Sequence, residues 1–231
     1  MKQISTKTRM LLTLSMLDGI GPAALRDVSE ISCFEVEEIP ELLARLPRYA
    51  EANEDALVIA AAVAEADRQI DLAQSADARI ISIADAEYPL LLKETRDDPR
   101  ILFVKGQLAK EPEKSVAIVG TREPTEHGKV IARRLAGFFV KEGWSVVSGL
   151  ALGCDAVAHE VALDAEGHTV AILAHGLHTV APSQHMRLAE RILESGGALV
   201  TEYKFGKEPV PRNFVKRDRI QAGFAKGVVM V

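Results

Sequence analysis

The hydrophobic pattern of this chain changes its period after Ser75. Up to that point apolar residues recur at helical spacing, as in the stretch Met10–Leu17, and an Ala-rich run covers residues 54–73. Beyond it, short apolar runs alternate with amphipathic stretches. We therefore predict a small all-α domain over residues 1–75 and an α/β domain over residues 76–231.

The first domain contains a glycine hairpin. A helical stretch over residues 7–17 is followed by Gly19-Ile20-Gly21-Pro22, and a second helical pattern begins at Ala23. This arrangement resembles a helix-hairpin-helix module, which holds a DNA phosphate with backbone N–H groups. Residues 1–75, however, carry thirteen acidic residues against seven basic ones, and such a balance repels phosphate. A packing hairpin is therefore the favoured interpretation. A further helix is expected over Glu41–Leu46.

In the second domain one strand-turn-helix unit stands out, from Ser115 to Ala136. The four residues Val116–Val119 are all apolar, as expected of a strand covered on both faces. A turn at Gly120-Thr121-Arg122 and a helix opening near Thr125 follow. Backbone N–H groups at such a turn favour an anion, usually a phosphate.

Strand and helix patterns alternate through the rest of the chain. We predict strands at 80–83, 101–104, 145–148, 169–174, 198–201 and 227–231, and helices at 155–165, 183–194 and 213–224. Alternation of this kind predicts an α/β fold, a Rossmann-like parallel sheet flanked by helices on both faces. Its ligands would lie beyond the carboxyl ends of the strands.

Composition limits what such a site can bind. The formal net charge is −5, so a surface coated in positive charge for bulk nucleic-acid binding is excluded. Residues 201–231 nevertheless carry seven basic residues against three acidic ones, which points to a local site for a polyanion. The two cysteines, Cys33 and Cys154, match no metal spacing and favour free thiols in a reducing cytoplasm. The start of the chain lacks a signal-peptide pattern, and no run is long enough to cross a membrane, so a cytoplasmic, soluble protein is expected.

Two loops and one helix carry the candidate chemistry. The loop that begins at Ser148-Gly149 leaves backbone N–H groups for a phosphate or forms a simple tight turn, and Asp155 is predicted to be the N-cap of the helix that follows. The segment Pro209–Gly223 places cations around Phe214. Cations interleaved with an aromatic ring suit a single nucleic-acid strand, although a solvated helix face with Phe214 in the core has the same pattern.

Four ordered motifs then carry a resemblance. GTREPTEHG, SGLALGCDAVAHEVAL, APSQHMRLAERILESGGALVTEY and PRNFVKRDRIQAG follow one another as in the DNA-processing protein A family (DprA, also called Smf), and EYPLLLKETRDDPRILFVKG is similar to its lead-in. The resemblance covers residue 79 to the end. It implies an extended Rossmann-like domain that binds single-stranded DNA, forms homodimers, protects incoming DNA and helps to load a RecA-type recombinase during natural transformation (competence) and DNA recombination.

The resemblance also implies a set of DNA-binding residues. Arg122 would meet a phosphate. Backbone contacts would come from Gly120, Thr121, Ser148 and Gly149, and the opposite wall from Arg212, Asn213, Phe214, Lys216, Arg217 and Arg219.

The sequence departs from the family at four of the matching positions. The family usually has arginine where Leu152 stands, isoleucine at Cys154, asparagine at Asp218 and isoleucine at Gln221. The loss of one cation and the gain of one carboxylate predict weaker or differently tuned DNA binding. The family also continues beyond the strand in which this chain stops, so the C-terminal part is expected to be missing.

Other functions are less well supported. Nucleotide phosphoribohydrolases of similar fold use a Pro-Gly-Gly-x-Gly-Thr turn that is absent here, and Glu202 has no partner acid, so no enzymatic activity is expected. A nucleotide-binding sensor shares the loop chemistry and stays an alternative, as does a nucleotide-processing enzyme. The chain has neither a dinucleotide nor an ATP fingerprint and no metal-ligand spacing, so no cofactor and no metal are expected.

Overall fold

The computed structural model describes residues 4–29, 38–44 and 55–231. Contacts divide the chain into two compact units, Met1–Tyr88 with Pro99–Leu102 and Pro89–Asp98 with Phe103–Val231. The boundary predicted after Ser75 falls within the first unit, at the end of its longest described helix. As a boundary between separately folding domains it stays a prediction.

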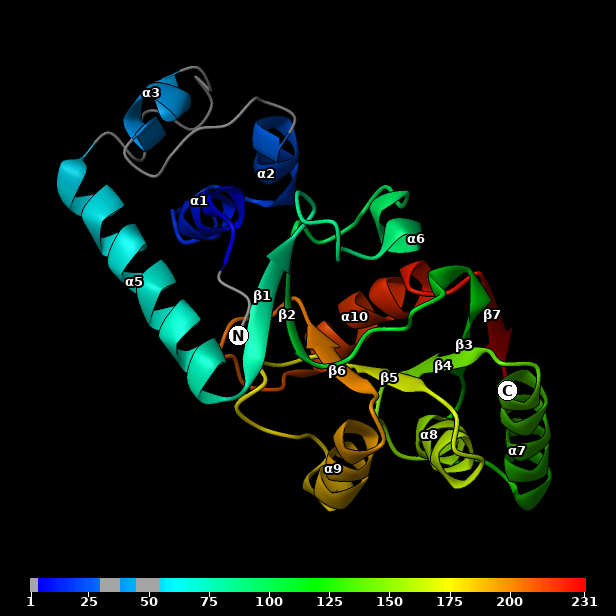
Figure 1. The fold of residues 1–231 in the computed structure, drawn as a ribbon. Helices are drawn as coiled ribbons and strands as arrows, with labels where there is room; N and C mark the ends of the chain where they lie inside the picture. Colours follow the sequence, from blue (N-terminus) through cyan, green and yellow to red (C-terminus); the bar gives the residue numbers. More distant parts are fainter. Residues whose placement is uncertain (1–3, 30–37, 45–54) are drawn as a thin grey trace. The chain divides into compact units, whose positions relative to one another are not determined.

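The first unit is mainly helical (Figure 1). Its described elements are α1 (Thr6–Leu14), α2 (Pro22–Ser29), α3 (Ile39–Ala44), α5 (Ala56–Ser75) and β1 (Ala78–Ser82). Helix α1 begins where the Ser5 hydroxyl accepts a hydrogen bond from the Thr8 N–H, and its apolar residues Leu11 and Leu14 are fully buried. The helices predicted from periodicity are confirmed where the chain is described. Residues 45–46 of the predicted third helix, and Cys33, lie outside the described residues.

The second unit is built on a sheet. Its strands are β2 (Ile101–Gly106), whose first two residues are counted with the first unit, β3 (Ser115–Val119), β4 (Ser145–Ser148), β5 (Thr169–Ile172), β6 (Ala198–Thr201) and β7 (Gly227–Met230). Within this unit the strand order is β2-β6-β5-β4-β3-β7. Strands β6, β5, β4, β3 and β7 are parallel, as predicted. Strand β2 is the exception, because it pairs with β6 in the antiparallel direction, and the sheet is therefore mixed.

Strand β2 differs from the prediction for a physical reason. A parallel neighbour needs a long crossover, usually a helix, between the two strands. The short helix α6 (Leu90–Lys93) precedes β2. Strands β2 and β6 are not consecutive, because β3, β4 and β5 with their helices lie between them in the chain, so no single crossover joins the two strands and makes them parallel.

Helices cover both faces of this sheet (Figure 1). Helices α7 (Glu126–Lys141), α8 (Cys154–Asp164) and α9 (Met186–Glu194) lie on one face, and α10 (Pro211–Gly223) lies on the other. Val116, Ile118 and Val146 are buried beneath α7 and α8. Every helix predicted after residue 145 is confirmed within a few residues. The turns after β3 and β4 and the helix α10 are thus brought to one end of the sheet.

None of the helices in the described part of the chain is both long enough and apolar enough to span a membrane.

Candidate nucleic-acid interface

The turn after β3 presents its side chains to solvent. Thr121 and Arg122 are exposed, and Gly120 is half-buried. The turn is held to the next loop because the Thr121 carbonyl accepts a hydrogen bond from Cys154 N–H at 3.1 Å. A Cβ at Gly153 would lie 2.3 Å from that same carbonyl oxygen, and Gly153 has a φ of +80°. Only glycine allows the two loops to approach so closely.

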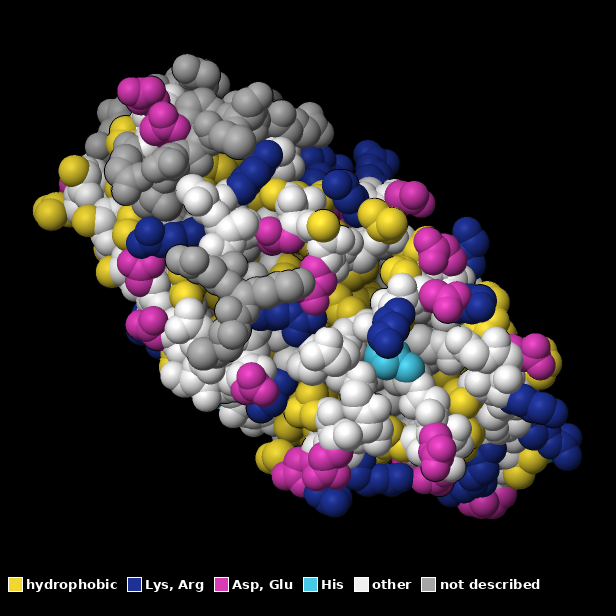
Figure 2. Space-filling model, in the orientation of Figure 1, with side chains coloured by type: hydrophobic (Ala, Val, Ile, Leu, Met, Phe, Trp, Pro, Cys, Tyr) yellow, Lys and Arg dark blue, Asp and Glu magenta, His cyan; other side chains and the backbone are white. Residues whose placement is uncertain are grey.

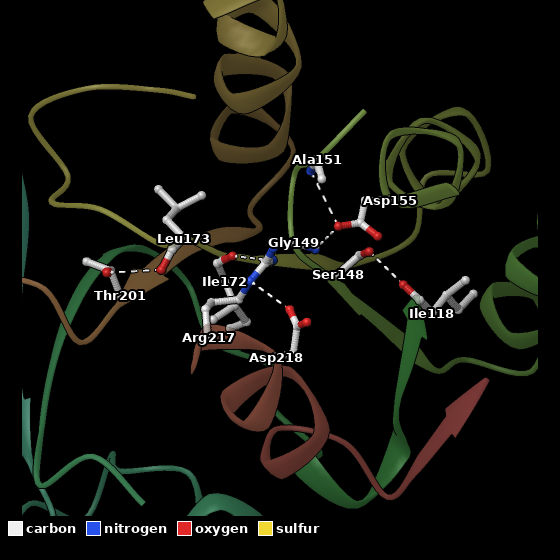
Figure 3. Close-up of polar contacts among 10 residues, drawn as sticks. All are labelled: Ile118, Ser148, Gly149, Ala151, Asp155, Ile172, Leu173, Thr201, Arg217 and Asp218. Atoms are coloured by element: carbon white, nitrogen blue, oxygen red, sulfur yellow. Dashed lines mark hydrogen bonds and ion pairs between the residues drawn. The ribbon is translucent and has the colours of Figure 1, made fainter. Parts of the chain in front are cut away.

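The loop after β4 is closed by Asp155. The prediction that Asp155 is the N-cap of α8 is wrong, because Gly153 occupies that position and Asp155 lies inside the first turn. Its carboxylate accepts hydrogen bonds from Gly149 N–H at 3.0 Å and from Ala151 N–H at 3.4 Å (Figure 3). The Ser148 hydroxyl donates to the Ile118 carbonyl at 2.6 Å. These polar groups of the loop are therefore already bonded within the protein.

Arg217 of α10 is a buried cation. Its side chain is only 3% exposed, Nη1 donates to the Ile172 carbonyl at 2.8 Å, and Nε lies 3.3 Å from Asp218 Oδ1 (Figure 3). A Cβ at Gly149 would lie 1.4 Å from Arg217 Nη1, so the guanidinium lies directly against the Gly149 backbone. The side chain joins α10 to the carboxyl ends of β4 and β5.

The charges in this cluster depend on one another. Burial raises the pKa of Asp155, while the charge of Arg217 and the loop N–H groups oppose that rise. Burial lowers the pKa of Arg217, and the charges of Asp155 and Asp218 oppose that shift. Each buried group thus compensates the desolvation of the other.

The outer face of α10 meets the turn after β3. The Arg122 guanidinium lies over the Phe214 ring, with 5.0 Å between Cζ and the ring centroid, in a cation–π contact. Phe214 is half-buried, while Arg212 and Lys216 on the same helix are exposed. Arg122 and the basic helix α10 therefore lie together on one surface of the second unit.

Arg219 is already paired within the protein. Its Nη2 lies 2.6 Å from Glu202 Oε2, and both side chains are largely buried, at 33% and 16% exposure. Burial and the neighbouring Glu202 raise the pKa of Tyr203 to about 12, so Tyr203 is a neutral phenol at physiological pH. A phosphate that bound Arg219 would have to displace Glu202.

The structure divides the predicted DNA-binding residues into two groups. The exposed or half-buried residues are Gly120, Thr121, Arg122, Arg212, Phe214, Lys216 and Arg219, and the buried ones are Ser148, Gly149, Asn213 and Arg217. Buried Asn213 donates to the Ala174 carbonyl at 3.2 Å. The DNA-binding role of the whole set stays a prediction. Direct contact with a ligand is therefore open only to the exposed and half-buried residues, and the buried ones bond within the protein.

The helical periodicity of α10 predicts which of its residues are buried. Asn213, Arg217, Ile220 and Gln221 recur at the spacing of one helix face, and all of them are buried. Sequence reasoning missed Gln221 and the loop-closing role of Asp155, because both depend on partners in other elements.

The surface over α7, α8 and α9, the helices on the sheet face opposite α10, carries mixed charge. Figure 2 shows Lys and Arg side chains interspersed with Asp and Glu side chains over α7, α8 and α9, rather than a continuous basic surface.

Comparison with known proteins identifies the relatives of this chain. The family model described as DNA recombination-mediator protein A matches residues 79–231. Protein Smf of Escherichia coli (strain K12) is 42% identical over 149 residues, which cover 64% of this chain and 40% of that protein. The chain spans well under two thirds of the length of this relative.

Two solved structures share the fold. The X-ray structure of DNA processing protein A from Streptococcus pneumoniae superposes with a TM-score of 0.68 and 26% identity, over 97% of this chain and 72% of that one. A Helicobacter pylori DNA processing protein A, solved to describe its single-stranded DNA binding mode, gives a TM-score of 0.57 and 27% identity, over 66% of this chain and 68% of that one.

Proposed function

Since the chain belongs to the DNA recombination-mediator protein A family, we propose that it binds single-stranded DNA and acts in DNA processing. The surface formed by Arg122, Phe214, Arg212 and Lys216 would meet the strand. We further propose that the protein protects incoming DNA, passes it to a RecA-type recombinase during natural transformation, and works as a homodimer. These roles follow the resemblance to the family.

One observation carries the binding proposal. Arg122, from the turn after β3, lies on Phe214 of α10, with exposed Arg212 and Lys216 on the same helix. An aromatic ring among cations suits an unpaired strand, because the cations meet phosphates while the ring stacks on a base. The single-stranded DNA binding mode described for the Helicobacter pylori relative supports the choice of ligand.

Fluorescence anisotropy with labelled oligo-dT tests this function. We expect saturable, salt-sensitive binding that an unlabelled single strand competes away far better than duplex DNA of the same length, because paired bases are not available for stacking. Equal competition by duplex would contradict the proposal. Displacement by a mononucleotide at concentrations that match the oligonucleotide's phosphates would favour a nucleotide sensor instead.

A further inference from the structure

Asp218 places a carboxylate inside the basic surface described above. It follows Phe214 by four residues, so the two side chains are neighbours on α10. The Arg122 guanidinium lies over that ring. The Asp218 side chain is 62% exposed, and its Oδ1 is 3.3 Å from Arg217 Nε. A negative charge therefore lies among the cations that a DNA phosphate would meet.

The buried Gln221 side chain holds the Asp218 carboxylate by a hydrogen bond. With the Gln221 amide oriented to satisfy both of its ends, Nε2 donates to Asp218 Oδ1 at 3.0 Å and Oε1 accepts from Gly149 N–H at 2.7 Å. Gln221 is 1% exposed, so it connects Asp218 to the loop after β4 without contact with solvent. The Gly149 N–H thereby faces two internal acceptors, Gln221 and Asp155.

Both arginines act on Asp218. Partial burial raises the pKa of Asp218, and the positive charges of Arg217 and Arg122 oppose the rise. Arg217 is committed to the Ile172 carbonyl and to the buried Asp155. Arg122 is exposed, and among the described residues its guanidinium makes a cation–π contact with the Phe214 ring. Arg122 is thus the cation that can exchange Asp218 for another anion.

We propose that Asp218 is a specificity-determining residue of this surface: held by Gln221, it serves as an internal counter-ion for Arg122 that a DNA phosphate has to displace. The proposal rests on the single-stranded DNA function proposed above. The protein would therefore bind a strand only where several phosphates and a stacked base act together. An isolated phosphate would not displace the carboxylate.

A double-mutant cycle tests this role. Labelled oligo-dT is titrated into the wild type, Asp218→Asn, Arg122→Ala and the double variant at moderate salt, about 0.1 M. We expect Asp218→Asn to bind about fivefold more tightly, because Arg122 then has no internal carboxylate that a phosphate must displace. In the Arg122→Ala background the same change should give less than about a twofold gain. A gain of equal size in both backgrounds would overturn the proposal.

Asp164→Asn is the charge-matched control. Asp164 ends α8, on the sheet face opposite α10, and pairs with Arg191 at the surface. The substitution Asp164→Asn removes the same charge from the protein as Asp218→Asn. We expect it to change the affinity for oligo-dT by less than about twofold at moderate salt, because exposed distant charges are screened. If Asp164→Asn strengthened binding as much as Asp218→Asn, the effect would be one of net charge and the proposal would be wrong.

A measurement without DNA separates this proposal from the proposed function. In urea unfolding of the same four proteins, we expect Arg122→Ala to lower the midpoint less in the Asp218→Asn background than in the wild type. Absence of this coupling would overturn the counter-ion role, whether or not DNA binds. Coupling without any binding of oligo-dT would support the counter-ion role of Asp218 and contradict the single-stranded DNA function.

Discussion

The packing around Arg217 requires a glycine at position 149. A Cβ there would lie 1.4 Å from Arg217 Nη1, so Gly149→Ala must push aside a guanidinium that also bonds Ile172 and compensates Asp155. We expect a loss of about 1–3 kcal/mol in the free energy of unfolding, as for other substitutions that overpack a buried site. Urea denaturation measures it.

Gly137→Ala is the matched control for that substitution. Gly137 lies inside α7, and the nearest atom to an added Cβ is Val161 Cγ1 at 3.8 Å, an ordinary contact. Alanine has the higher helix propensity, so we expect a gain of roughly 0.5–1 kcal/mol. A loss of similar size in both variants would mean that the contact with Arg217 is not what makes Gly149 necessary.

His159 makes stability depend on pH. It is fully buried, and its Nδ1 lies 2.7 Å from the Thr169 hydroxyl, which itself donates to the Val146 carbonyl. The imidazole Nδ1–H is therefore the donor. Burial lowers the pKa of His159 from 6.5 to about 3. The folded-state pKa of His159 lies below its unfolded-state pKa, so below pH 6.5 the unfolded chain binds a proton that the folded protein does not. The contribution of neutral His159 to the free energy of unfolding is therefore complete above pH 6.5 and is lost as pH falls toward 3.

The His159→Gln variant isolates this effect. Between pH 7 and pH 5 the wild type should lose about 2 kcal/mol more of its free energy of unfolding than the variant, since the unfolded imidazole takes up a proton that the folded one refuses. Urea denaturation at the two pH values measures both losses. Equal losses would show that His159 does not carry the pH dependence.

Helix α10 is the element on which the proposed interface depends. Its existence, its ends and its basic outer face followed from the sequence. The partners of its buried polar residues did not, because Arg217 and Gln221 bond to Ile172 and Gly149, which lie far away in sequence. Periodicity predicts which face of a helix is buried, but it does not predict which carbonyl or carboxylate will meet an arginine there.

A pair of substitutions tests how α10 is attached. Arg217→Met removes the positive charge that compensates buried Asp155 and leaves the Ile172 carbonyl without its donor, and we expect a loss of roughly 1–3 kcal/mol in the free energy of unfolding. Asp155→Asn combined with Arg217→Met removes both charges and should recover a large part of that loss. A double variant no more stable than Arg217→Met, measured by urea denaturation, would contradict the electrostatic compensation between these two charges.

The sheet was predictable because each parallel strand is a short apolar run with a helix after it. The direction of β2 was not, since an apolar run such as Ile101–Val104 fits either direction in a sheet and its partner β6 is not the next strand in the chain. The candidate surface was predictable from the turn that follows β3 and from the basic residues of α10, whereas the internal use of Ser148 and Gly149 was seen only in the structure.

At the scale of the whole molecule, charge sets the salt dependence of binding. The protein carries a formal net charge of −5, so long-range attraction to DNA is weak and the local cations decide. If Arg122, Arg212 and Lys216 each neutralise one phosphate, the logarithm of the binding constant should fall with the logarithm of salt concentration with a slope of about −2. Titrations at several salt concentrations give the slope directly, and a slope near zero would exclude phosphate contacts.

The measurement that tests the account most directly compares two arginines. Labelled oligo-dT is titrated into the wild type, Arg122→Ala and Arg134→Ala, where Arg134 is an exposed residue of α7. We expect Arg122→Ala to weaken binding about tenfold, as for the loss of one charge-assisted contact, and Arg134→Ala to leave it nearly unchanged. Equal affinities for all three proteins, or equal losses in both variants, would contradict a single-stranded DNA site at the turn after β3.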